Sequence, residues 1–270
     1  GFGVYQDLNH EVAMVKEHVN RSLEYLIEEY HVDGFRFDLT KGLTNQSGKD
    51  SAYDQSRVDI LTGYYNTIKA ANPDAVVILE HFVDDENYEL GNRGMKVWRN
   101  MNNAYCQSAM GYQSDSDFGG LEDINYQWAA FGTYVGFMES HDEERAFFKA
   151  KQWGNGDLKT NEEARVARVP LNMAFLTMLN GPKMFYHFAE LGFDYSKYQN
   201  AQGKWGKNDY GITSELGADY DCKMQAKYRP EAWMKAPHCR HAAFKKVGQT
   251  IQLRTRLMPE VFEGNPTASS

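Results

Sequence analysis

The sequence contains little cysteine and no concentrated positive charge. Its 270 residues include three cysteines, Cys106, Cys222 and Cys239, which are scattered and show neither the spacing of a disulfide framework nor that of a zinc site. We therefore expect free thiols. The formal net charge is -8, and the sequence has no basic run. Because basic residues supply most of the affinity of proteins for nucleic acids, we expect no nucleic-acid partner.

Long apolar runs and internal repeats are also absent. No stretch approaches the roughly 20 apolar residues that cross a bilayer, and no charged segment followed by an apolar one stands at the N-terminus. We therefore expect no membrane partner. The chain starts at Gly1 rather than at a methionine, which is expected either after removal of a leader or within a longer gene product.

The residues that are present favour a large α/β fold. Hydrophobic residues make up 42% and aromatic residues 14% of the chain, enough for a sizeable core and for flat surfaces on which rings stack. Apolar positions at steps of three and four predict helices. The first helix is expected from residue 11 to 30, with an apolar face made of Val12, Val15, Val19, Leu23, Leu26 and Tyr30. A second helix is expected over 58–68, and Asn72 and Pro73 end it. A third is expected over 164–179, interrupted by Pro170, and a terminal helix over 238–256.

Short apolar runs between these helices predict about five strands. The alternation of strands and helices indicates right-handed crossovers and a parallel sheet. After the last strand, the segment 195–237 is rich in Gly, Lys, Asp and Tyr and is expected to be a substrate loop, as in barrel enzymes, or else a linker. The predicted strands cover residues 32–37, 76–79, 95–98, 134–138 and 183–188.

Two charged residues interrupt the first apolar strand, VDGFRFDLTKG from Val32 to Gly42. Successive side chains of a strand point to opposite faces, so Arg36 and Asp38 share one face. A neighbouring guanidinium favours the ionised carboxylate and fixes its orientation. Asp38 is therefore a candidate nucleophile; the alternative is an internal ion pair with no chemical role.

Two other acidic sites follow predicted strands. Glu80 ends the run VVIL, where apolar surroundings are expected to raise its pKa and suit it to a general acid, although it could simply begin a helix. His141 and Asp142, in MESHDEER, could hold a hydroxylated ligand or form an ordinary turn. Together, Asp38, Glu80 and Asp142 follow three parallel strands, at the face where barrel enzymes build their sites. Two carboxylates with pKa values pushed apart are what cleavage of a glycosidic bond requires.

The segments DGFRFD, ILEH and MESHDEER resemble, in order, three signature segments of the α-amylase superfamily of glycoside hydrolases. The resemblance implies hydrolysis of α-1,4-glucosidic bonds in starch-like α-glucans with retention of configuration. It implies a carboxyl separation of about 5 to 5.5 Å between nucleophile and acid. The implied roles are Asp38 as nucleophile, Glu80 as general acid/base, Asp142 and His141 as transition-state stabilisers, Arg36 as partner of the nucleophile, and Lys41 and His81 as substrate-binding residues.

Weaker similarities extend this match. QDLNHE resembles the segment before the nucleophile strand, which implies Asp7 as a ligand of a structural calcium ion; the chemistry itself requires no cofactor. Gly42 follows Lys41 where the family often has histidine, so contacts on the leaving-group side of the cleaved bond stay open. FAELG, from residue 188 to 192, resembles the segment after the final barrel strand.

The similarity begins in the middle of the family's catalytic domain. It implies a partial (β/α)8 TIM-type barrel over residues 1–258, roughly strands 4 to 8 with their helices, and a tail over 259–270 that leads towards a C-terminal domain. The first three strands are missing. Because five parallel strands leave open edges, we expect a larger gene product or a partner that supplies the N-terminal half of the barrel.

Other functions use the same residues differently. A transglycosylating or branching α-glucan enzyme would need the same carboxylates, whereas a non-catalytic carbohydrate-binding homologue usually lacks one of them. A phosphotransferase that binds magnesium through Asp33 and Asp38 is disfavoured, because five residues along a strand place these side chains on opposite faces. The localisation stays unknown, with a polysaccharide substrate slightly favouring a secreted or periplasmic protein.

Overall fold

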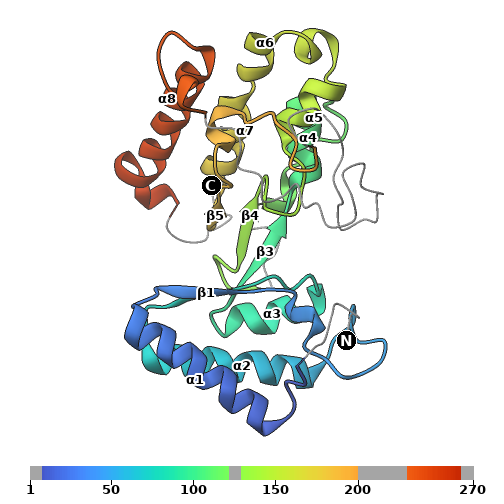
Figure 1. The fold of residues 1–270 in the computed structure, drawn as a ribbon, viewed down its shortest axis with the longest axis vertical. Helices are drawn as coiled ribbons and strands as arrows, with labels where there is room; N and C mark the ends of the chain where they lie inside the picture. Colours follow the sequence, from blue (N-terminus) through green and yellow to red (C-terminus); the bar gives the residue numbers. More distant parts are fainter. Residues whose placement is uncertain (1–7, 122–128, 200–229, 263–270) are drawn as a thin grey trace, which may run out of the picture. The chain divides into compact units, whose positions relative to one another are not determined.

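The computed structural model describes residues 8–121, 129–199 and 230–262 (Figure 1). Helices and strands alternate along the chain, as the sequence predicts. The strands are β1 Gly34–Phe37, β2 Val76–Leu79, β3 Lys96–Asn100, β4 Tyr134–Phe137 and β5 Lys183–Met184. The helices are α1 Ala13–Tyr30, α2 Gln55–Ala71, α3 Asp84–Asn92, α4 Asn102–Met110, α5 Ala146–Trp153, α6 Glu162–Val166, α7 Val169–Met178 and α8 Cys239–Gln252.

The five strands follow the order β1-β2-β3-β4-β5 in one sheet. β1 and β2 are parallel in the register Gly34↔Val76 to Phe37↔Leu79, and β2–β3 and β4–β5 are parallel as well. Glycine is required at the start of β1, because a Cβ atom on Gly34 would lie 2.1 Å from the carbonyl oxygen of Val76. The sheet confirms an α/β fold of the kind found in part of a (β/α)8 barrel; which barrel strands these are stays a prediction.

The chain forms two compact units, residues 1–99 with 123–135, and residues 100–122 with 136–270. The expected boundary at residue 258 stays a prediction, and residues 263–270 of the expected tail lie outside the described part. None of the helices in the described part of the chain combines the length and the hydropathy needed to cross a bilayer.

In the first unit, α1 and α2 lie side by side (Figure 1). Leu23 and Ile27 of α1 are buried, and Val19 packs against the same core. The apolar face predicted for this helix is therefore partly wrong: Leu26 is 38% and Tyr30 65% exposed. The buried stripe is rotated from the expected one, since steps of four residues from position 19 lead through 23 and 27. The other core residues come mainly from α2, β2 and β3.

The second unit has its own core, formed mainly by α4, α5, α7 and α8. The helix predicted over 164–179 is two helices, α6 and α7, with Pro170 in the first turn of α7. Proline is tolerated there because the amide hydrogen that it lacks would have no partner within the helix. The predicted terminal helix ends as an α-helix at Gln252 and continues as a π-helical turn to Leu257.

Three helices of the structure were not predicted: α3, α4 and α5. Each has eight or nine residues, too few for the 3.6-residue period to repeat clearly. The last strand is also shorter than predicted, ending at Met184 rather than at residue 188. Of the segment expected to be a substrate loop, residues 200–229 lie outside the described part.

Candidate active site

Asp38 and Glu80 stand at the same edge of the sheet in the first unit. Phe37 and Leu79 are the last register pair of β1 and β2, so each carboxylate follows the C-terminal end of its strand. The backbone amide of Glu80 donates to the Phe37 carbonyl at 3.0 Å, and the Leu39 amide donates to Oε2 of Glu80 at 2.9 Å. The parallel pairing of the strands therefore brings these two predicted site residues together.

Arg36 contacts both carboxylates. Its Nη1 lies 2.5 Å from Oδ1 of Asp38, and its Nη2 lies 2.9 Å from Oε2 of Glu80. The second contact lacks the alignment of a hydrogen bond, so it is an electrostatic contact. The guanidinium also stacks on Trp98, 4.2 Å from the ring centre. The prediction that Arg36 and Asp38 are neighbours is confirmed, although Asp38 lies one residue past the end of β1.

The two carboxylates have unlike surroundings. The Asp38 side chain is 73% exposed, whereas that of Glu80 is 11% exposed. Burial raises the pKa of Glu80; the amide of Leu39 and the charge of Arg36 oppose this rise, and a hydrogen bond with Asp38 adds to it. The sequence predicted a raised pKa for Glu80 because this residue follows an apolar strand, and the structure agrees. The raised pKa favours the protonated acid.

The backbone is strained at two residues near this edge of the sheet. Leu39 has φ 43° and Phe82 has φ 53°, both in the left-handed region that residues other than glycine rarely adopt. The left-handed turn at Leu39 comes directly after Asp38, and its amide is the donor to Glu80. Residues in such conformations persist only when surrounding contacts hold them, and they cluster at functional sites.

A buried polar network lies behind Glu80. The Thr40 hydroxyl donates to the Glu80 carbonyl at 3.0 Å and lies 2.9 Å from Nδ1 of His81. Nε2 of His81 lies 2.7 Å from Oε2 of Glu86, which also accepts from Nε of Arg57 at 2.9 Å. The side chains of His81, Glu86 and Arg57 have no exposed surface. This network holds the residues that follow each of the two carboxylates, Thr40 after Asp38 and His81 after Glu80.

His81 and Lys41 are the two further residues that were predicted to bind substrate. Both ring nitrogens of His81 are engaged inside the protein, so contact with a substrate would require the ring to leave Thr40 or Glu86. Burial lowers the pKa of His81. Lys41 lies in a 3₁₀ turn, Thr40–Gly42, and its carbonyl accepts from Nη1 of Arg57 at 2.7 Å. Substrate binding by either residue stays a prediction.

Asp142 and His141 form a pair in the second unit. Nε2 of His141 lies 3.3 Å from Oδ2 of Asp142, and their side chains are 49% and 37% exposed. The amide of Asp142 donates to the hydroxyl of Ser140 at 3.1 Å. The pair thus presents a partly exposed carboxylate on a turn that is held by its own hydrogen bonds.

Ser196–Tyr198, at the start of the segment 195–237 that was predicted to be a substrate loop or a linker, holds this turn, a role that sequence reasoning missed. The Tyr198 hydroxyl donates to the carbonyl of Asp142, and Nζ of Lys197 donates to the carbonyl of Ser140 at 2.5 Å. The Lys197 amide donates to Glu144 at 3.0 Å, and the Ser196 hydroxyl donates to the same carboxylate. Burial lowers the pKa of Lys197 to about 8. We call Ser196–Tyr198 the clasp; no periodicity or motif in the sequence predicts it.

Family comparison agrees with this geometry. The family described as "Alpha amylase, catalytic domain" matches residues 3–247. The chain belongs to this family. No curated protein matches the chain.

Solved structures show the same α/β fold at low identity. A pullulanase of Anoxybacillus sp. LM18-11 in complex with maltotetraose has a TM-score of 0.60 and 18% identity over 93% of this chain and 35% of that one. Amy13B of Eubacterium rectale has a TM-score of 0.62 and 16% identity over 97% and 50%. Pullulanase type I of Bacillus subtilis str. 168, complexed with maltose, has a TM-score of 0.55 and 17% identity over 88% of this chain and 33% of that one. This α-amylase-family chain thus spans a third to a half of their lengths.

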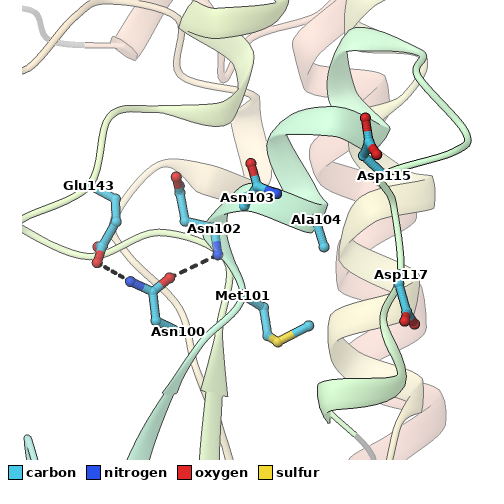
Figure 2. A pocket seen from close by; sticks show the side chains of 8 residues that line it. All are labelled: Asn100, Met101, Asn102, Asn103, Ala104, Asp115, Asp117 and Glu143. Carbon is cyan, nitrogen blue, oxygen red and sulfur yellow. Dashed lines mark hydrogen bonds between the residues drawn. The ribbon is translucent and has the colours of Figure 1, made fainter. Parts of the chain in front are cut away.

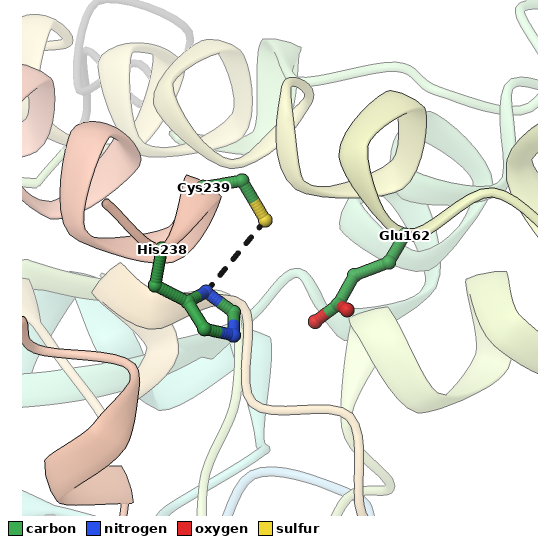
Figure 3. A group of neighbouring side chains, drawn as sticks. All are labelled: Glu162, His238 and Cys239. Atoms are coloured by element: carbon green, nitrogen blue, oxygen red, sulfur yellow. Dashed lines mark hydrogen bonds between the residues drawn. The ribbon is translucent and has the colours of Figure 1, made fainter. Parts of the chain in front are cut away.

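Within the described part of this α-amylase-family chain, three metal-ligating groups converge in the second unit. Glu162, His238 and Cys239 have ligand atoms within 4.8 Å of one another (Figure 3). Glu162 is already paired with Arg240 at 2.8 Å, and Nδ1 of His238 accepts from the Arg240 amide at 3.2 Å. These partners account for the cluster without an ion. Asp7, the position expected to bind calcium, lies outside the described residues, so that role stays a prediction.

Proposed function

We propose that this chain is the catalytic portion of an enzyme that hydrolyses α-1,4-glucosidic bonds in starch-like α-glucans with retention of configuration. The observation that carries the proposal is the arrangement at the ends of β1 and β2. There, the exposed carboxylate of Asp38 and the buried acid Glu80, whose pKa is raised, share one guanidinium. Retaining hydrolysis requires one ionised and one protonated carboxyl group side by side.

In the first step, an oxygen of Asp38 attacks the anomeric carbon while Glu80 transfers its proton to the glycosidic oxygen. A bond forms between Asp38 and the sugar, the glycosidic bond breaks, and the remaining glucan leaves as an alcohol. Arg36, 2.5 Å from Asp38, orients the attacking oxygen. Burial raises the pKa of Glu80, which favours the protonated form that donates this proton.

In the second step, ionised Glu80 takes a proton from water, and the water oxygen attacks the anomeric carbon. The bond to Asp38 breaks and its carboxylate is regenerated. Two inversions give net retention. Asp142 and His141 are assigned, from the family resemblance, to the sugar hydroxyls next to the cleaved bond, and Lys41 and His81 to further substrate contacts. A glucan hydroxyl in place of water would give transglycosylation.

We propose further that the five strands are strands 4 to 8 of the family's barrel and that another segment supplies the N-terminal half. The support is the coverage of the solved structures, which is 35% of the Anoxybacillus chain and 50% of Amy13B. Open edges on a parallel sheet would otherwise be exposed.

The test uses the complete product of the coding region with soluble starch as substrate. We expect release of reducing ends, with products that carry the α configuration in early NMR spectra. Asp38→Asn and Glu80→Gln should each remove turnover without loss of folding, while Asp74→Asn, in an exposed turn, should leave it unchanged. Products of the β configuration, or glucan binding with no cleavage by the folded enzyme, would overturn the proposal. Longer chains among the products would indicate a transglycosylating or branching enzyme instead.

A further inference from the structure

Trp98, in β3, stacks on the guanidinium of Arg36. Cζ of Arg36 lies 4.2 Å from the centre of the indole ring, well within the roughly 6 Å over which a cation is attracted to an aromatic face. Trp98 directly follows Val97, the register partner of Leu79, just as Glu80 directly follows Leu79. Because side chains alternate along parallel strands, Trp98 and Glu80 belong to the same face of the sheet.

Arg36 has few other contacts that fix the plane of its guanidinium. Within the described part of the chain, its Nε and Nη2 are buried without a hydrogen-bond partner, and its Nη1 donates to Asp38. The Asp38 side chain is 73% exposed, and the contact of Nη2 with Glu80 is electrostatic and not directional. The indole ring is therefore the rigid surface against which this guanidinium lies.

Arg57, in the buried network behind the site, is held in a different way. Its Nε and Nη2 donate to Glu86, and its Nη1 and Nη2 donate to three backbone carbonyls. Hydrogen bonds thus use all three nitrogens and fix one charge partner. An aromatic ring instead attracts the face of a guanidinium and leaves its N–H groups unused. Stacking therefore lets Arg36 remain shared between two carboxylates.

Trp98 itself offers little surface to a ligand. The residue is 8% exposed, and Arg36 covers one face of its ring. It does not line the cavity of about 510 Å³ in the second unit, whose wall begins two residues later, at Asn100 (Figure 2). A sugar ring could stack only on an open aromatic face. An effect of Trp98 on the reaction therefore has to pass through Arg36.

We infer that Trp98 is a positioning residue whose indole ring holds the Arg36 guanidinium between Asp38 and Glu80. The inference rests on the proposed function and adds a residue to its machinery. With the guanidinium held, the attacking oxygen of Asp38 stays oriented and the positive charge stays beside Glu80. Without the ring, the guanidinium can turn away about its side-chain bonds, and fewer enzyme molecules have both carboxylates correctly paired.

The test compares two replacements of similar size in the complete gene product, with soluble starch as substrate. Trp98→Met removes the aromatic face and should lower kcat about 2- to 30-fold, the range that corresponds to loss of one cation–π interaction. KM should stay almost unchanged, because the ring does not bind the sugar. Trp98→Phe keeps an aromatic face and should have a kcat between those of Trp98→Met and the parent.

Tyr134→Met is the matched control. Tyr134 is another buried aromatic residue of the first unit, and its ring centre lies 5.9 Å from Cζ of Arg99. This replacement also removes a cation–π contact and buried surface, but at an arginine outside the proposed machinery. It should lower the thermal stability and leave kcat unchanged.

A double-mutant cycle with Arg36→Met separates positioning from general packing. If Trp98 acts through Arg36, then Trp98→Met should have little further effect on kcat once Arg36 is replaced, because contacting residues that act together are not additive. Thermal unfolding of each variant checks that it is folded. If Trp98→Met does not fold, the same cycle with Trp98→Phe decides.

Equal kcat values for Trp98→Met and its parent, or fully additive losses in the cycle, would overturn the inference while leaving the proposed function intact. A raised KM with an unchanged kcat would also overturn it, because the ring would then bind substrate. Absence of α-glucan cleavage by the unaltered enzyme would instead reject the proposed function and the role of Trp98 with it.

Discussion

The guanidinium of Arg36 lies 2.9 Å from the carboxylate of Glu80, and both side chains are largely buried, with 25% and 11% of their surface exposed. The charge of Arg36 opposes the rise in the pKa of Glu80 that burial causes. Glu80 is thus kept between two opposing influences, and the balance decides the pH at which it still holds a proton.

Replacement of Arg36 should change the pKa of Glu80. In Arg36→Met, loss of the positive charge should raise the pKa of Glu80 further, so the alkaline limb of kcat should shift to higher pH. The value of kcat should fall because Asp38 loses the group that orients it. The measurement is the pH profile of kcat on soluble starch. Arg36→Lys, which keeps the charge, is the control, and an alkaline limb that moves to lower pH in Arg36→Met would contradict the assignment of Glu80 as the acid.

Glu86 should account for part of the loss of stability in acid. Burial opposes its ionisation, but hydrogen bonds from His81, Arg57 and the Asp54 amide lower its pKa in the folded state. A lowered pKa gives stability that is present above the unfolded value of about 4.3 and is lost as the pH falls through the folded value. Glu86→Gln should therefore flatten the stability profile in acid.

At neutral pH the same substitution should destabilise the first unit by about 3–5 kcal/mol, because it leaves the buried Arg57 without a counterion. Urea unfolding between about pH 3 and pH 7 measures both effects. Glu89→Gln, in a more exposed pair with Arg93, should cost at most about 1 kcal/mol. An unchanged acid profile in Glu86→Gln would show that the network does not contribute.

The clasp should support turnover through Asp142. Tyr198→Phe removes the donor to the Asp142 carbonyl, and the loss of one neutral hydrogen bond, about 0.5–1.5 kcal/mol, should lower kcat several-fold if it loosens this turn. Tyr112→Phe removes an equivalent bond, from the hydroxyl to the Trp153 carbonyl at 2.9 Å, and should affect stability only. Steady-state kinetics and thermal unfolding separate the two. Equal kcat values for both variants would mean that the clasp has no part in positioning Asp142.

Because of Lys197, the stability of the second unit should increase as the pH rises into the moderately alkaline range. Burial lowers its pKa to about 8, below the unfolded value of about 10.4. Between these values the unfolded state binds more protons, so the free energy of unfolding rises with pH. Lys197→Met should lack this rise, whereas Lys245→Met, at an exposed position, should keep it. Thermal unfolding at about pH 7 and about pH 9.5 gives the comparison, and identical pH dependence in the two variants would contradict a buried, titrating Lys197.

Some features of the site could be predicted because they depend on local periodicity. The alternation of side chains along a strand places Arg36 beside Asp38, and the position of Glu80 after VVIL puts it at the end of a buried strand. The face of α1 was misjudged for the same kind of reason. Several apolar stripes fit one helical sequence, and the packing partner, here α2, selects the one that is buried.

By itself, then, the sequence determined the alternation of strands and helices, the order of the acidic segments and the pairing of Arg36 with Asp38, all of which depend on residues close together in the chain. Only the tertiary structure decided that His81 faces inward onto Glu86, that Arg57 meets Glu86 across 29 residues, and that Tyr198 holds Asp142 across 56 residues. Such contacts have no sequence period, because they arise only when the folded backbone brings distant polar groups together and burial requires each to find a partner.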